Sequence, residues 1–144
     1  MPTIAAAFRD HQTAILDRLE EAGSLLEDSG RPSGDRLDAS RNGIGDALTA
    51  YQRFKHCEVY DPIITAGGAD APAAAALKAD CEALARDYQA YCTGVEAGDG
   101  VLASYRRATL DMATRVKHAL IREFELVRQL TVYPDYATRP VGGA

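Results

Sequence analysis

Three short breaks rich in glycine and proline divide this 144-residue chain more clearly than any other feature. They fall at 29–34, 66–72 and 97–100, and glycine and proline are the strongest interrupters of regular structure. Four segments remain, at about 3–27, 35–64, 73–96 and 101–130, each too long for a single strand. Because short links between long helices favour antiparallel neighbours, the spacing predicts an all-α fold, an antiparallel up-down four-helix bundle.

Apolar periodicity supports this prediction. Each segment has apolar residues at three- and four-residue steps, the spacing of one face of an α-helix. Gly43 and Gly45 each cost about 1 kcal/mol relative to alanine inside a helix, so we expect frayed structure at the start of the second helix. The bundle is expected to form one domain at 1–132. The remaining residues, 133–144, contain two prolines and a Gly-Gly pair and are expected to be a flexible C-terminal tail.

Composition excludes several classes of protein. Charged residues interrupt every apolar stretch, so no run reaches the ~20 residues of a membrane span, and the N-terminus lacks the features of a secretory signal. We therefore expect a cytoplasmic protein. The net charge of −5 disfavours nucleic-acid binding, because the basic residues of the last helix are scattered among acidic ones. No catalytic nucleophile or phosphate-binding loop stands out, so we expect no enzyme.

Histidines and cysteines are the residues most able to carry chemistry. The three cysteines, Cys57, Cys81 and Cys92, cannot all pair within one chain and show no CxxC spacing, so they are expected to be buried thiols. His11 lies within the apolar stripe of the first helix, where an imidazole needs a polar partner or a metal. His56 is followed by several polar residues on the second helix.

Three segments of the chain resemble the hemerythrin-like family, whose four-helix bundles hold a non-haem di-iron site. Phe8-Arg9-Asp10-His11 is similar to the opening F/L-R-x-x-H of that family. The segment from Phe54 to Ile63 is similar to its H-x-x-x-E segment leading to a proline, and Ile121 to Leu126 is similar to its closing Glu-rich turn. The resemblance covers about 8–130 and implies that His11, His56 and Glu123 are metal ligands.

The chain also departs from the family pattern. Tyr60 stands where a bridging carboxylate is expected, with Asp61 one position later, and Cys81 stands where the third helix should supply a histidine. His118 falls opposite the apolar stripe of the last helix and is expected to point to solvent. The resemblance therefore implies a reduced or lost site, with iron as the metal if one is bound. The candidate ligands are His11, His56, Tyr60, Asp61, Cys81, His118 and Glu123.

Three functions remain open at this point. The resemblance implies a binding or regulatory protein that senses oxygen, nitric oxide or redox state. The second is a metal-free helical module that binds a protein partner or forms a homodimer, with tyrosines as anchors. The third, ranked last, is a histidine phosphotransfer bundle, which needs a histidine exposed on a helix. His11 bonded to a hydroxyl such as that of Tyr60, with no metal, is an equally good interpretation of that histidine.

Overall fold

A computed structural model describes residues 1–27, 34–96 and 102–143. Its elements in order are α1 (Ile4–Glu27), α2 (Gly34–Lys55), the π-helical turn η1 (His56–Tyr60), α3 (Asp61–Ala66), α4 (Ala71–Glu96), α5 (Leu102–Arg128) and α6 (Tyr133–Ala137). The described residues form no β-strand beyond an isolated bridge between Thr3 and Pro140. The all-α prediction is confirmed for this part of the chain. Residues 29–33 of the predicted break at 29–34, and the whole of the predicted break at 97–100, lie outside the described residues, while Gly34 begins α2.

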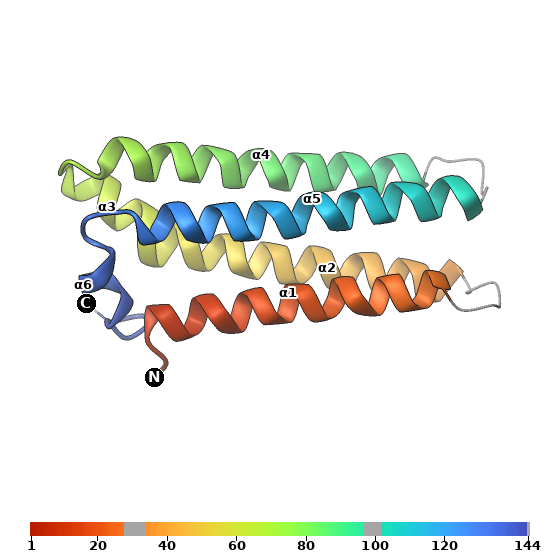
Figure 1. Ribbon diagram of the computed structural model, residues 1–144, viewed down its shortest axis with the longest axis horizontal. Helices are drawn as coiled ribbons and strands as arrows, with labels where there is room; N and C mark the ends of the chain where they lie inside the picture. Colours follow the sequence, from red (N-terminus) through yellow and green to blue (C-terminus); the bar gives the residue numbers. More distant parts are fainter. Residues whose placement is uncertain (28–33, 97–101, 144) are drawn as a thin grey trace.

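The long helices lie side by side along the length of the molecule (Figure 1). Helix α1 packs mainly against α2, and α4 packs mainly against α5. Successive long helices run in alternating directions, with α2, η1 and α3 forming one continuous rod (Figure 1). Among the described helices, none has a stretch long and apolar enough to cross a membrane.

The apolar stripes predicted from the sequence meet in one core. Burying such side chains is the main favourable contribution to folding, about 25 cal/mol per Å² of apolar surface. Phe8 lies at the centre of an aromatic group, with its ring 5.1 Å from that of Phe54 and 6.0 Å from that of Tyr51 in edge-on contacts. The largest fully buried side chains are Ile4, Phe8, Ile15, Leu26, Tyr51, Val59, Tyr60, Val116 and Val127.

The expected fraying at Gly43 and Gly45 is wrong, because α2 is helical through both positions. Tertiary packing outweighs the low helix propensity of glycine here. A Cβ atom at position 45 would lie 3.4 Å from the Tyr88 ring, and one at position 43 would lie 3.5 Å from the Arg18 guanidinium. At both glycines, side chains of the neighbouring helices therefore lie within van der Waals distance of a Cβ atom on α2.

The irregular part of this rod lies instead at η1, five residues that the sequence analysis assigned to a regular helix. Its defining bond runs from the Asp61 N–H to the carbonyl of His56, five residues back. Pro62, the second residue of α3, has no N–H, and its ring would clash with a carbonyl of the preceding turn in an ideal helix. A π-turn placed before the proline relieves this conflict, and π-turns are frequent at functional sites.

The C-terminal residues, which we expected to form a flexible tail, are tied to one end of the bundle. The Ile4 N–H donates to the Arg139 carbonyl and the Val141 N–H donates to the Pro2 carbonyl, each at 2.9 Å. The Asp70 carboxylate, just before α4, accepts bonds from the N–H groups of Thr131 and Val132 in the link between α5 and α6. These contacts hold the last segment against the end of the bundle where the chain begins (Figure 1).

Candidate functional site

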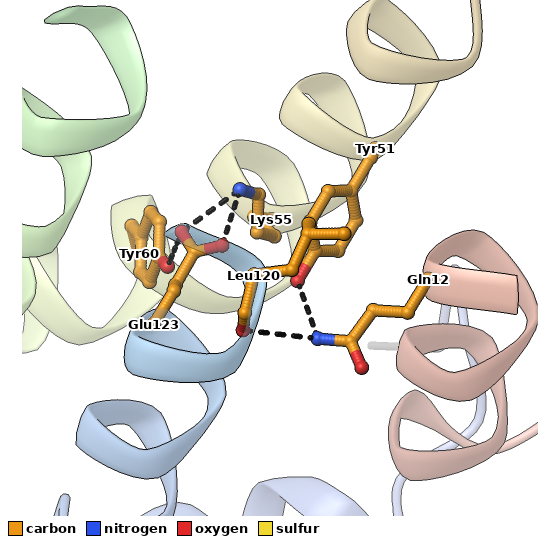
Figure 2. Close-up of polar contacts among 6 residues, drawn as sticks. All are labelled: Gln12, Tyr51, Lys55, Tyr60, Leu120 and Glu123. Atoms are coloured by element: carbon orange, nitrogen blue, oxygen red, sulfur yellow. Dashed lines mark hydrogen bonds and ion pairs between the residues drawn. The ribbon is translucent and has the colours of Figure 1, made fainter. Parts of the chain in front are cut away.

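A buried ion pair between Lys55 and Glu123 forms the polar centre of the protein (Figure 2). Lys55 ends α2 and Glu123 lies in the second half of α5, so the pair joins two helices. The Lys55 Nζ lies 2.7 Å from Oε1 and 2.8 Å from Oε2 of the glutamate. The two side chains are only 3% and 11% exposed. A charge pair so deep in a core is uncommon, because desolvating each ion costs several kcal/mol.

Tyrosine side chains complete the surroundings of this pair. The Tyr60 hydroxyl, from the π-turn η1, donates to Glu123 Oε2 at 2.6 Å. The Lys55 ammonium also lies 3.8 Å from the centre of the Tyr51 ring, a cation–π contact. Burial, followed by the nearby Glu123 carboxylate, raises the pKa of Tyr60 far above its ordinary value, so its hydroxyl stays protonated as a donor.

Gln12 connects this centre to α1. Its side-chain amide donates to the Tyr51 hydroxyl at 3.2 Å and to the Leu120 carbonyl at 3.5 Å (Figure 2). Polar side chains from α1, α2, η1 and α5 therefore meet at one level of the core. Every oxygen of the Glu123 carboxylate has a donor within 2.8 Å, so the negative charge is already neutralised by the protein's own ammonium group.

A groove of about 610 Å³ between α4 and α5 reaches this ion pair from the surface. Lys55 and Glu123 line its inner part together with Cys81, and exposed side chains such as His118 and Arg122 line its rim. Burial raises the pKa of the Cys81 thiol, although nearby Lys55 acts in the opposite direction. The neutral thiol is a weak nucleophile and a weak metal ligand, so Cys81 serves here mainly as an apolar side chain.

His11, the first predicted ligand, lies between α1 and α2. Its ring is stacked on Phe54 with centroids 5.0 Å apart, and it also contacts the Tyr51 ring at 5.8 Å. Tyr60 is bonded to Glu123, so the alternative of a His11–Tyr60 hydrogen bond is not the arrangement found. Desolvation lowers the pKa of His11, opposed in part by Asp10, so the neutral imidazole is favoured at pH 7.

His56, the second predicted ligand, faces α4 and not His11. Desolvation, followed by the charge of Lys78 on α4, lowers the pKa of His56. Its Nε2 is buried, without a hydrogen-bond partner among the described residues. Neighbouring Asp61 accepts a bond from the Lys78 ammonium at 2.6 Å. The pair formed by Asp61 and Lys78 thus lies on the α4 side of the rod, away from Glu123.

The predicted ligands therefore do not converge. Tyr60 and Glu123 meet directly, Cys81 lies near them, His11 and His56 lie on different sides of α2, and His118 is exposed on α5. Across residues 1–27, 34–96 and 102–143, no three His, Cys, Asp or Glu side chains are grouped so that they could hold a metal ion. The prediction of three buried thiols is wrong for Cys57, which is exposed, while Cys92 is half-buried.

Lys55, Tyr51 and Gln12 were not among the residues that the sequence analysis selected. A signal for Lys55 was available, because it continues the four-residue steps from Tyr51 to Val59 along the buried stripe of the second helix. A lysine at such a position needs a buried partner of opposite charge. Glu123 was selected for its resemblance to a metal ligand. Its actual partner, Lys55, could not be identified until the fold brought the two side chains together in the core.

Comparison with known proteins gives no further assignment, since no family model, curated protein or solved structure matches the chain.

Proposed function

We propose that this protein is a non-enzymatic, antiparallel four-helix-bundle binding protein of the hemerythrin-like type, in which Lys55 takes the place of the metal ion. The observation that carries the proposal is the bidentate contact of the Lys55 ammonium with Glu123, a residue that the family resemblance identifies as a ligand. In a metal centre the cation neutralises inward-facing carboxylates. Here an ammonium supplies that positive charge, and a tyrosine supplies the remaining donor.

The other predicted ligands support this proposal through their contacts. His11 is stacked between helices on an aromatic ring, and Asp61 is engaged by Lys78 on the outside of the bundle. A di-iron site needs carboxylates and imidazoles that converge from several helices. Moving these side chains to one point would break the ion pairs and the stacking that hold them. The metal-free helical module is therefore the better of the two leading interpretations.

A binding role is favoured by the groove between α4 and α5, which opens the buried ion pair to the surface. Its volume of about 610 Å³ lies within the range typical of small-molecule pockets. Apolar side chains such as Leu77, Leu84 and Leu126 alternate in its lining with polar ones. A ligand or a partner side chain that enters there would contact Lys55 and Glu123. Binding would therefore change the contacts that hold this ion pair together.

Metal analysis of protein purified from iron-supplemented cells tests the proposal. We expect an iron content far below about one atom per chain, and a melting temperature that neither a chelator nor added iron changes, because no metal binds the native state. A stoichiometric iron content that disappears in His11→Ala or His56→Ala would overturn the proposal and establish a surviving metal site. His118→Ala, a change at an exposed histidine, is the matched control.

A further inference from the structure

Exposed apolar side chains gather on one face of the protein. Leu16, Leu110 and Ile121 are 42%, 47% and 61% exposed, and with Met1 they make up the exposed large apolar residues of the described chain. Leu16 of α1 and Leu110 of α5 line the same cleft between these two helices. Ile121 lies one helical turn beyond Lys117, which also lines the cleft, and so it lies on the same flank of α5.

The cleft between α1 and α5 is not filled by the protein's own side chains. Its volume is about 580 Å³, and it extends inward to Ile44 of α2 and Tyr88 of α4. Gly23 lines it on the α1 side, and a Cβ atom added there would meet no atom within 4 Å. Apolar surface of this kind on a water-soluble domain marks a contact with another molecule.

The two helices that border the cleft carry opposite charges. Helix α1 has five acidic and two basic residues, a net charge of −3, whereas α5 has six basic and three acidic residues, a net charge of +3. The same contrast holds at the rims of the cleft, where α1 contributes Glu20 and Glu27 and α5 contributes Lys117. A covering molecule should therefore present a basic surface to α1 and an acidic surface to α5.

We propose that this molecule is a second copy of the chain, bound through the α1/α5 face with the twofold axis parallel to the helices. Rotation about such an axis places α1 of each copy on α5 of the other, so that acidic meets basic twice. A twofold axis across the helices would instead place α1 on α1 and α5 on α5, with like charges opposed. The face is thus complementary to itself in one of these two orientations only.

The register of α1 and α5 specifies contacts within this dimer. Arg106 donates to the Leu26 carbonyl at 2.7 Å, and the Gln12 amide lies 3.5 Å from the Leu120 carbonyl. These two contacts show which residues of the antiparallel helices α1 and α5 lie side by side. An axis parallel to the helices keeps every residue at its own level. Glu27 of one copy therefore faces Arg106 of the other, and Leu16 and Leu110 of each copy face the cleft of the other.

Sedimentation equilibrium of the full chain, from about 1 to 100 µM, tests this proposal. We expect a dimer that Leu110→Glu and Ile121→Glu each weaken at least about tenfold, because they place a charge in a desolvated apolar contact. Ala90→Glu, the same charge added to an exposed site on α4, is the matched control and should leave the dimer unchanged. Since all three positions are exposed, circular dichroism should show the same helix content in every variant.

Charge reversal tests the orientation. Glu20→Lys combined with Glu27→Lys should weaken the dimer and reduce its sensitivity to salt, and the further change Lys117→Glu should restore part of the affinity. A protein that stays monomeric over the whole concentration range would overturn the proposal. If Leu110→Glu and Ile121→Glu leave the dimer affinity unchanged, this face is not the interface. If the charge reversals leave the affinity unchanged, α1 of one copy does not pair with α5 of the other.

Discussion

Lys55 and Glu123, 68 residues apart in the sequence, form a bidentate ion pair inside the bundle, with Nζ 2.7 and 2.8 Å from the two carboxylate oxygens. A buried ion pair contributes little net stability, because the desolvation of both charges offsets most of their attraction. Replacing only one of the two side chains is different, because the remaining buried charge is then left without a partner. This asymmetry allows the pair to be tested directly.

Lys55→Met should lower the free energy of unfolding by about 3–5 kcal/mol, because Glu123 remains buried and unpaired. The double variant Lys55→Met with Glu123→Leu should recover most of this loss. Urea unfolding followed by circular dichroism measures both. Lys78→Met is the control, since it removes the more exposed pair with Asp61 and should change stability far less. Equal losses for Lys55→Met and Lys78→Met would contradict a buried charge pair.

Tyr60→Phe should cost about 1.5–3 kcal/mol, because it removes a 2.6 Å hydrogen bond to the Glu123 carboxylate and keeps the ring. Tyr51→Phe is a close comparison on the same rod. The Tyr51 hydroxyl accepts a longer bond from a neutral amide, at 3.2 Å, and its loss should cost about 0.5–1.5 kcal/mol. Chemical denaturation of the two variants should rank Tyr60→Phe as the more damaging; the reverse order would argue against the assignment of the Tyr60 bond.

Stability should fall as the pH is lowered from 7 to about 5.5. Desolvation lowers the pKa values of His11 and His56 in the folded state below the ordinary value of 6.5. The unfolded chain therefore binds more protons in this window, so the free energy of unfolding falls as the pH drops below 6.5. The part that depends on these two histidines is lost completely only once both are protonated in the folded state as well. Replacing both histidines with glutamine should flatten the dependence. An unchanged slope in the double variant would show that other groups cause it.

Gly94→Ala should raise the free energy of unfolding by about 0.5–1 kcal/mol, because position 94 is exposed within α4 and an added Cβ meets nothing within 4 Å. Gly45→Ala should gain less or lose stability. The same helix-propensity gain applies there, but the new Cβ would lie 3.4 Å from the Tyr88 ring. Thermal unfolding of the two variants gives the comparison, and equal gains would show that Tyr88 moves freely away from α2.

The sequence alone determined that the chain is helical and where most of its long helices lie, because helix periodicity and glycine breaks are local properties. It also identified Tyr60 and Glu123 as residues of interest, and it placed His118 on an exposed face. The π-turn at 56–60 was not predicted, although Pro62 was visible, because the sequence does not say whether a proline ends, bends or widens a helix.

Tertiary structure alone decided which polar residues meet. Lys55 and Glu123 become partners because the fold brings the end of α2 and the second half of α5 to the same level of the core, which the sequence of neither helix reveals. The same packing separates His11 from His56 onto different sides of α2 and leaves a cleft open between α1 and α5. Local pattern fixes which face of a helix is buried, whereas the identity of each buried contact depends on side chains that only the fold brings together.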